Sequence, residues 1–412
     1  MIVDFFTVGI LTTFSVFIYL AFFWKINWIR DLTKQDTRSS KFRARKTRKI
    51  GDLPPVYPNG WFAVLESSNL KRGQVEHVSA LGQNLAVFRT DSGVACILDA
   101  YCPHLGANLA EGGQVKGEDL ECPFHCWRFC GKSGKCTSIP YLNKAAGSIK
   151  TRVWESCEAN GVIFMWHHAE HSQPYWWPQQ IEKIENGSWG YQGRNEFYIN
   201  CHIQEIPENG ADWAHLEALH GPSILATNLL SNLVHHSWTN VGWSTDYTES
   251  RRCTEIETYP NESEKSTPQD QSMKHIATSR LCHQVVLFNR LSILKLDVTA
   301  TQIGPGYVEL LLQTTFGPMC IIQTVTPLEP LLQRVTHLMF APVFMAPYSR
   351  VTMLGECLMF ERDAQVWNYK KYLDNPILIK EEKTIKEFRR WYEQFYSKNS
   401  PSYESCKDSL EW

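Results

Sequence analysis

The first feature of the chain is a long apolar run near its start. Residues Phe5–Trp24 read FFTVGILTTFSVFIYLAFFW, twenty residues without a charge. A helix needs about that number of residues to cross a hydrocarbon core roughly 30 Å thick. A cleaved signal peptide is the alternative, but no basic segment precedes the run and no small-residue cleavage site follows it. The pattern therefore predicts a transmembrane helix.

Short β-rich runs separated by turns come next. Asp52–Trp61 is rich in Pro and Gly and marks the start of the first folded unit. This pattern of short runs, rich in apolar, β-branched and aromatic residues and bounded by turn signals, is typical of strands. It predicts a small antiparallel domain with strands within residues 61–66, 83–90, 94–101 and 161–166.

A different pattern begins near residue 171. A helical pattern around Ala211–Leu219 precedes strand-like runs within 280–315, and a strongly helical stretch starts at Met353. Mixed elements of this kind predict an α+β fold. The polar segment Asn261–Ser272 has almost no apolar residue and predicts a mobile surface loop.

Length and composition agree with more than one domain. A chain of 412 residues exceeds a typical single domain, and 43% hydrophobic and 20% charged residues are ordinary globular values. We therefore predict four parts: a transmembrane anchor at 1–24, a basic linker at 25–56, a β-rich domain at 57–170 and an α+β domain at 171–412.

Charge bears on topology more than on partners. The net charge of -2 gives no overall attraction to nucleic acid, and no nucleic-acid partner is expected. Locally, basic residues follow the apolar run at Lys25, Arg30, Lys34, Arg38 and within Lys41–Lys49. By the positive-inside rule they hold this flank in the cytosol, where they also contact anionic lipid. The 13 cysteines are too sparse for a disulfide scaffold, which suggests reduced thiols or metal ligands.

Two short loops each combine one Cys with one His. Cys102 and His104 are spaced C-x-H, and seventeen residues later Cys122 and His125 are spaced C-x-x-H. In a Rieske centre two thiolates hold one iron and two imidazoles hold the other, so each loop would supply a ligand to each iron. Neutral imidazoles raise the reduction potential of the cluster, which suits an electron acceptor fed by a reductase.

A Cys₂His₂ zinc site uses the same residue types. Zinc modules usually begin with a pair of Cys and end with a pair of His, whereas each loop here contains one of each. The order therefore favours the [2Fe–2S] cluster. The nearby Cys126, Cys130 and Cys136 are interpreted as ordinary thiols, since four ligands are already present.

A second motif lies near the middle of the chain. Asp212, His215 and His220 occur in IPENGADWAHLEALHGP. Two His five residues apart can converge if a helix loosens before the second, and they would then form the imidazole pair of a 2-His-1-carboxylate iron site. Asp212 precedes His215 by one helical turn, from where its carboxylate could orient the imidazole. Taken alone, an acidic and His-containing helix is more often a solvated face.

The third ligand must be a carboxylate brought in by folding. We choose Asp363, in the helical stretch MFERDAQVWNYKKYL. Glu361, Glu356 and Asp374 are competitors, although Glu361 faces another side of a helix than Asp363. A surface ion pair with Arg362 is the plainer role for Asp363.

Together the two motifs resemble the Rieske oxygenase family. Stretches between Gly51 and Pro401 narrow the resemblance to the Neverland-type cholesterol 7-desaturases: DLPPVYPNGW, YCPHLGAN, CPFHCWRF, CHIQEIPENGADWAHLEALH, QTVTPLEPLLQRV, FERDAQVWNYKKY and RRWYEQFYSKNSP. The Cys/His set and the His pair are typical of the whole family. HIQEIPENGADWAH and the FERD helix are similar to the desaturases in particular.

The resemblance implies a role for each motif residue. The two Cys and two His of the first motif would hold the cluster. His215, His220 and Asp363 would hold a mononuclear Fe(II), and Asp212 would be an electron bridge. At the position of Cys126 the family usually has Gly. This departure bears on the reduction potential of the cluster and not on the residues that hold it.

The resemblance also implies an architecture. A β-rich Rieske domain would join a helix-grip, START-like α+β catalytic domain, and three chains would form a head-to-tail homotrimer. Within one chain of such enzymes the two metal sites are too far apart for efficient transfer. Electrons would pass from His125 of one chain through Asp212 to His215 of the next.

The implied reaction is the O₂- and NAD(P)H-dependent 7,8-dehydrogenation of cholesterol to 7-dehydrocholesterol, in steroid hormone biosynthesis. A ferredoxin- or flavin-type reductase would deliver the electrons. The expected location is the endoplasmic reticulum membrane, with the catalytic domains in the cytosol. Two alternatives stay open: a Rieske monooxygenase that hydroxylates another sterol or apolar substrate, and a non-catalytic electron carrier.

Overall fold

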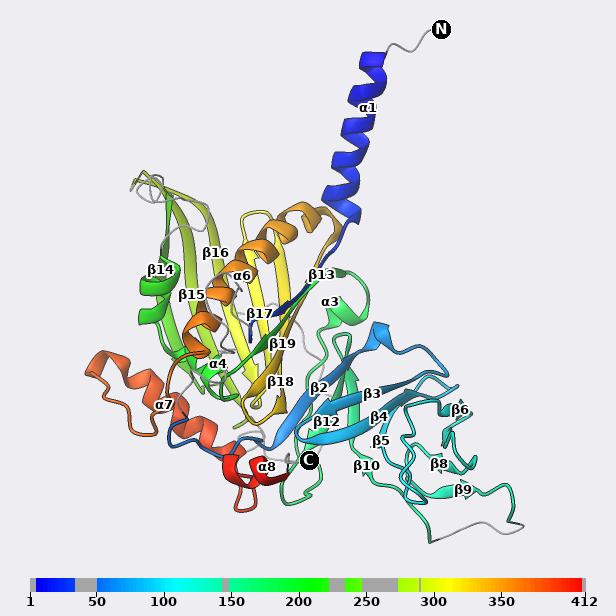
Figure 1. Cartoon of the computed structure of the whole chain (residues 1–412). Coiled ribbons are helices and arrows are strands. Elements are labelled where there is room, and N and C mark those ends of the chain that lie inside the picture. Colours follow the sequence, from blue (N-terminus) through cyan, green and yellow to red (C-terminus); the bar gives the residue numbers. More distant parts are fainter. Residues whose placement is uncertain are drawn as a thin grey trace, which may run out of the picture.

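The computed structural model describes residues 5–33, 50–142, 148–221, 234–246, 273–288 and 290–409. Two β-rich bodies pack together, and a helix projects from one end of the larger body (Figure 1). The predicted α+β fold is confirmed. The loop predicted at 261–272 and the basic run at 41–49 lie outside the described residues.

The smaller body contains three antiparallel sheets within the described residues. One sheet consists of β11 (Ser156–Ala159), β12 (Val162–His167) and β2 (Gly60–Glu66). The second consists of β10 (Val153–Trp154), β5 (Ala95–Asp99), β4 (Gln83–Arg89) and β3 (Val75–Ala80). The third consists of β6 (Gln114–Lys116), β7 (Asp119–Glu121), β8 (Arg128–Cys130) and β9 (Cys136–Ser138). The four strand runs predicted in this half are confirmed as β2, β4, β5 and β12.

The larger body is built on one eight-stranded sheet, in the order β1-β13-β19-β18-β17-β16-β15-β14. All neighbours are antiparallel except the first pair. The strands are β1 (Ile26–Asp31), β13 (Gly190–Ile199), β14 (Val234–Ser244), β15 (Ile276–Leu287), β16 (Leu291–Ile303), β17 (Tyr307–Thr314), β18 (Pro318–Glu329) and β19 (Leu332–Ala341).

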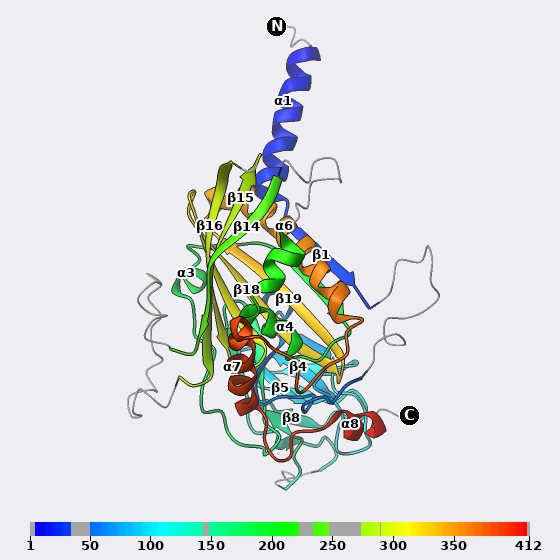
Figure 2. The ribbon, with the colours of Figure 1, turned by 90° about the vertical axis from the view of Figure 1, so that its left-hand side faces the viewer.

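One long helix, α6 (Ala346–Trp367), lies across the β13 and β19 end of this sheet (Figure 2). It buries Met353, Cys357, Phe360 and Ala364, spaced three or four residues apart, so one stripe faces the sheet. Shorter helices complete the body: α3 (Glu182–Glu185), α4 (Glu205–Glu208), α7 (Lys383–Tyr392) and α8 (Tyr403–Ser409).

The segment predicted as a basic linker contains a strand. β1 pairs in parallel with β13, with Ile26 opposite Gly193. A Cβ at Gly193 would lie 2.8 Å from the carbonyl oxygen of Ile26, so the close approach of the two strands requires glycine. Residues 26–31 therefore belong to the edge of the large sheet, a placement that their sequence did not indicate.

The apolar run at the start of the chain is helical. α1 spans Phe5–Ile18, and residues Tyr19–Phe23 continue it as a π-helix. In the part of the chain that the structure describes, no helix combines the length and the apolar character that crossing a membrane requires. The transmembrane helix predicted for Phe5–Trp24 is thus not supported.

Polar contacts and a common core join the two bodies. The Arg194 guanidinium lies 2.8 Å from the Glu66 carboxylate, across the contact between β13 and β2. Arg334 donates to the carbonyl oxygens of Ala63 and Val64 at 3.2 and 3.0 Å. One buried cluster contains side chains from β2 together with others from β13 and β19. The bodies are therefore packed as one unit.

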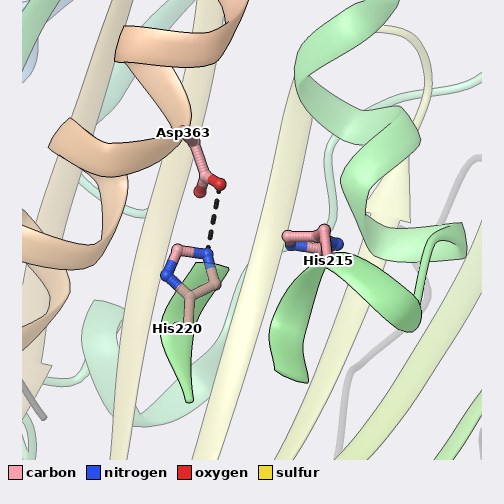
Figure 3. Close-up of side chains that lie close together, drawn as sticks. All are labelled: His215, His220 and Asp363. Atoms are coloured by element: carbon pink, nitrogen blue, oxygen red, sulfur yellow. Dashed lines mark hydrogen bonds and ion pairs between the residues drawn. The ribbon is translucent and has the colours of Figure 1, made fainter. Parts of the chain in front are cut away.

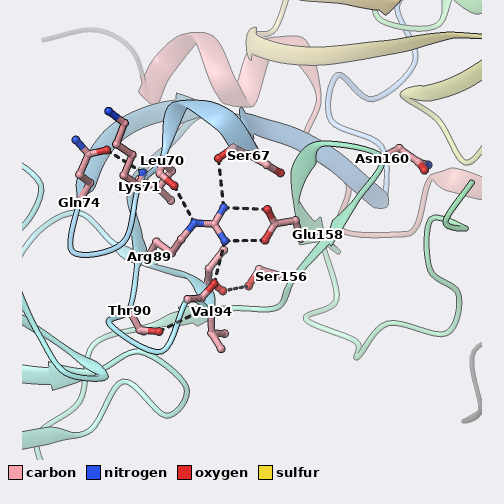
Figure 4. Close-up of polar contacts among 12 residues, drawn as sticks. Ser67, Leu70, Lys71, Gln74, Arg89, Thr90, Val94, Ser156, Glu158 and Asn160 are labelled. Atoms are coloured by element: carbon pink, nitrogen blue, oxygen red, sulfur yellow. Dashed lines mark hydrogen bonds and ion pairs between the residues drawn. The ribbon is translucent and has the colours of Figure 1, made fainter. Parts of the chain in front are cut away.

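Within the smaller body, Arg89 joins two of the three sheets. Its guanidinium donates to both carboxylate oxygens of Glu158, at 2.9 and 2.8 Å, and so ties β4 to β11 (Figure 4). It also donates to the carbonyl oxygens of Leu70 and Gly93 at 2.8 and 2.9 Å. Only 12% of the Arg89 side chain is exposed, so water cannot readily replace these bonds.

Replacing Arg89 with Met should destabilise the protein. The change removes the bidentate pair and leaves buried carbonyl oxygens unpaired, which is expected to lower the free energy of unfolding by about 2 kcal/mol. Urea unfolding followed by tryptophan fluorescence measures the loss.

Arg128→Met is the matched control. Arg128 makes a single 2.7 Å contact with Glu121 and its side chain is 42% exposed. Its loss should cost less than about 1 kcal/mol, as for other surface ion pairs. Equal losses for the two variants would contradict the bridging role of Arg89.

Candidate iron centres

The first motif lies on two loops of the smaller body, after β5 and after β7. The side chains of Cys102 and Cys122 are buried, whereas His104 and His125 are partly exposed. The two imidazole rings meet edge to face, with centroids 4.7 Å apart. Burial raises the pKa of Cys102 to about 11, so binding of iron would have to displace the thiol proton. The two loops thus lie side by side, with the Cys side chains inside and the His side chains toward solvent.

The two loops share one backbone design. In each, the Cys N–H donates to the carbonyl five residues later, and the Cys carbonyl accepts from the N–H four residues later, at 2.8 to 3.1 Å. The fourth residue after Cys102 is Gly106, with φ +74°, and the fourth after Cys122 is Cys126, with φ +58°. This backbone suits glycine, and a side chain there costs about 1 kcal/mol. The unusual Cys126 therefore occupies a glycine-type turn beside a predicted ligand.

The donor geometry bears on the zinc alternative. Within the described residues, the donor atoms of His215, His220 and Asp363 lie within 4.8 Å of one another. The four residues of the first motif do not form such a group. A single zinc ion needs its four ligands at about 2.0 to 2.3 Å. A [2Fe–2S] cluster takes only two of the ligands on each iron, so it does not need all four donor atoms to converge on one point.

The second motif forms an unusual helical turn. His215 lies just before a π-helix, Leu216–His220, that ends at His220. Hydrogen bonds in such a turn join residues five apart, so His215 and His220 lie on one side of it. The His215 and His220 rings are 5.4 Å apart and nearly perpendicular. The loosened helix that the spacing requires is thus present.

Asp363 reaches this turn from α6 (Figure 3). Its Oδ1 lies 3.1 Å from Nε2 of His220, and the donor atoms of His215, His220 and Asp363 all lie within 4.8 Å of one another. Arg362 donates to the carbonyl oxygen of Leu219 at 3.1 Å and so fastens the helix to the turn. The structure therefore brings the three predicted iron ligands together.

The competing carboxylates have other partners. Glu361 lies 2.5 Å from the Arg30 guanidinium of β1, on another side of α6. Glu356 contacts Nδ1 of His337 at 2.6 Å and accepts from Asn195 at 3.0 Å. Neither belongs to the convergent group, and nor does Asp374.

Asp212 contacts His215 in a way that the spacing did not predict. The imidazole Nδ1 of His215 bonds to the backbone carbonyl oxygen of Asp212, and the carboxylate lies 3.9 Å away. Oδ1 of that carboxylate accepts from the backbone N–H groups of Ala214 and His215 at 3.1 and 3.3 Å. The carbonyl, not the carboxylate, orients the ring, and 30% of the Asp212 side chain stays exposed.

The converging donors suit a mononuclear iron. Two imidazoles and one carboxylate are the ligands of non-haem Fe(II) oxygenases, and they leave positions open for O₂ and substrate. Burial lowers the pKa of His215 and so favours the neutral imidazole that a metal needs. The 3.1 Å separation of Nε2 of His220 and Oδ1 of Asp363 matches two neighbouring ligands that each lie about 2.1 Å from one ion.

Sequence reasoning missed three aromatic residues on the sheet beside this centre. The Trp238 ring lies 6.5 Å from His220 and 4.4 Å from His283, and Nδ1 of His236 contacts Nε2 of His283 at 2.7 Å. Burial lowers the pKa of His283 to about 4, so the ring is neutral near pH 7. In the sequence, only the spacing of His236 and Trp238 by two residues indicated that both side chains lie on one face of a strand. It gave no indication of His283 on the neighbouring strand β15.

Comparisons with known proteins agree with both halves. Residues 60–154 match the Rieske [2Fe-2S] domain family, and residues 165–396 match the 3-Ketosteroid 9alpha-hydroxylase C-terminal domain family. The chain is 43% identical over 378 residues to a cholesterol 7-desaturase nvd of Xenopus laevis, a match that covers 89% of this chain and 78% of that protein. It is 40% identical over 411 residues to the cholesterol 7-desaturase nvd of Drosophila melanogaster, covering 94% and 90%.

A solved structure shares the fold. Dicamba monooxygenase bound to dicamba superposes with a TM-score of 0.57 at 14% identity, over 83% of this chain and 98% of that one. The sequence matches are much closer and extend over most of the chain. The chain therefore belongs to the Rieske oxygenases and, within them, to the family of the cholesterol 7-desaturases.

Proposed function

We propose that this chain is a cholesterol 7-desaturase, which removes two hydrogens across the 7,8 bond of cholesterol. Cholesterol, O₂, two electrons and two protons give 7-dehydrocholesterol and two molecules of water. The electrons come from NAD(P)H through a reductase. The observation that carries the proposal is the pair of donor sets in one chain whose relatives, at 40 and 43% identity over most of its length, are cholesterol 7-desaturases.

The residues divide the work between two centres. The two Cys and two His of the first motif would hold the [2Fe–2S] cluster, and His215, His220 and Asp363 would hold the Fe(II). When bound, these groups supply electron transfer and activation of O₂. The chain itself keeps the His215 ring neutral by burial, orients it through the carbonyl of Asp212, and sets Asp363 by the packing of α6.

Electron transfer between chains is part of the proposal. The loops of the first motif, beside β7 and β8, lie far from α6 in both overall views (Figures 1 and 2). His125 and Asp212 each have partly exposed side chains, as residues at a contact between chains require. A head-to-tail homotrimer would bring the Rieske domain of one chain to Asp212 of the next, and a three-fold ring closes such a contact.

A membrane location also belongs to the proposal. Exposed apolar side chains occur along α1 and the π-helix after it, including Ile10, Phe14, Phe17 and Phe23, and apolar surface of this kind partitions into lipid. The basic residues that follow support the cytosolic side of the endoplasmic reticulum membrane. Such a location would give the enzyme direct access to a sterol substrate dissolved in the bilayer.

Hydroxylation is the second candidate. The family matched by residues 165–396 is named for a 3-ketosteroid 9α-hydroxylase, so the same domain type can carry that outcome. Desaturation and hydroxylation both start from one apolar substrate and O₂. They differ in whether an oxygen atom remains in the product.

Product analysis should separate the two outcomes. With cholesterol, O₂, NAD(P)H and a reductase, we expect a product two hydrogens lighter than cholesterol, identified by mass spectrometry as 7-dehydrocholesterol. A product heavier by one oxygen atom would favour the hydroxylase. The same reaction without O₂ is the control.

Asp212→Asn should slow turnover without loss of metal. Removing the carboxylate charge removes the proposed electron bridge, and we expect the rate to fall at least about 100-fold. The amide oxygen can still accept from the N–H groups of Ala214 and His215, so the turn should stay folded. Rapid-mixing oxidation of the reduced cluster measures the transfer, and wild-type rates would contradict the bridge.

Asp363→Ala should reduce the iron content from about three to about two per chain, because the cluster keeps its two irons. Glu361→Ala is the matched control, two residues away on the same helix and paired with Arg30. It should retain about three. Elemental analysis together with the visible spectrum of the cluster checks both, and the reverse result would make Glu361 the ligand.

A further inference from the structure

Apolar side chains gather on the catalytic domain at the base of α1. Three segments supply them. They are the end of the π-helix with Phe23 and Trp24, the β17–β18 turn with Phe316, and the 3-10 turn Val343–Met345 with the start of α6, which supplies Val343, Phe344 and Val351. Phe23, Trp24 and Phe316 are 66, 43 and 58% exposed, and Val343, Phe344 and Val351 are 70, 66 and 64% exposed. We call these six residues the basal patch.

Contacts place the three segments side by side. The π-helical residues Tyr19–Phe23 contact α6, and Arg350 of α6 donates to the carbonyl oxygen of Trp24. The Phe316 ring lies 5.3 Å from the ring of Tyr348. Figure 1 shows the start of α6 directly beside the base of α1. The basal patch is therefore one surface, continuous with α1.

The segments that form the patch contain few charges, although Lys25 follows Trp24 and the Lys295–Asp297 pair lies on the neighbouring strand β16. Pro342–Leu354 contains a single charged residue, Arg350. That side chain turns inward: only 6% of the residue is exposed, and its guanidinium donates to the carbonyl oxygens of Trp24 and Ala346. The turn from Thr314 to Gly317 carries no charge either. Surfaces of soluble domains normally intersperse charges among apolar residues.

The shape of α1 indicates what covers the patch. Ile10, Leu11 and Val16 are each more than half exposed, and at 100° per residue they point to different sides of the helix. A second protein chain would cover one stripe and leave the others in water. A lipid phase covers all sides at once.

We propose that the basal patch rests in the surface of a phospholipid bilayer, with α1 inserted beside it. The catalytic domain is then held at a fixed orientation and does not hang from a flexible tether. Val351 lies at the lipid surface, and Asp363 lies twelve residues further along the same helix, about 18 Å away. The functional reason for this orientation depends on the proposed function, because a sterol substrate dissolved in the bilayer would then be supplied near the candidate iron ligands.

A lipid-contact measurement on the full chain tests the proposal. An environment-sensitive fluorescent amino acid replaces Phe344 in one variant, Phe14 of α1 in a second and Ile377 in a third. Ile377 is the matched control, because it is apolar and 99% exposed yet lies after α6, outside the patch. Each protein is reconstituted in phosphatidylcholine vesicles with and without brominated acyl chains, which quench fluorophores in contact with lipid.

We expect bromine to quench the probes at positions 344 and 14 at least about twofold and to leave position 377 unchanged. Quenching at 14 alone would overturn the basal patch while leaving membrane contact by α1. A blue-shifted probe at 344 that bromine does not quench would also overturn it, in favour of a protein partner. Absence of quenching at both positions would overturn the patch and the membrane location together. None of these outcomes depends on catalysis, so a failed product assay remains a separate result.

Discussion

The packing of α6 against the large sheet is the constraint on which the iron centre depends. Asp363 and the His pair come from segments more than 140 residues apart, so only tertiary structure can bring them within ligand distance. Glu356, seven residues before Asp363, meets His337 and Asn195 on the sheet, and Arg362 meets the π-helical turn. Buried polar contacts of this kind gain little net stability but tolerate few alternative arrangements, which suits the positioning of a candidate ligand.

Much of this could be predicted from the sequence, for identifiable reasons. The predicted strands of the smaller body are short apolar runs between turn signals, and most of the candidate metal ligands occur at short spacings, so local pattern sufficed. Helical geometry indicated only that Asp363 and Glu361 face different sides, and the choice of Asp363 depended on the family resemblance. The pairing of β1 with β13 joins residues about 167 apart and leaves no local signal. The contact of His236 with His283 likewise depends on strand register, and the carbonyl that orients His215 has no side-chain signature.

The same packing explains why the two bodies are not independent. Arg334 reaches from β19 to the backbone of β2, and Thr326 of β18 donates to the carbonyl oxygen of Ala63 at 2.7 Å. Because the apolar cluster beneath these bonds is shared, reorienting one body would expose core side chains of both. The separation between the two donor sets is thus a fixed property of the chain. Hinge motion between the two bodies is therefore not a route by which the two kinds of centre could approach each other.

The edge strand β1 has a practical consequence for anyone who shortens the protein. Cutting the chain just before residue 50 would remove α1, but it would also strip β13 of its neighbour and expose a row of unpaired backbone groups. Three contacts of α6 and the residue after it would be lost at the same time: Arg350 with Trp24, Glu361 with Arg30, and Asn368 with Leu32. A shortened form that starts at Trp24 keeps all of these bonds. Residues 26–31 are thus an edge strand of the large sheet and not part of a flexible linker.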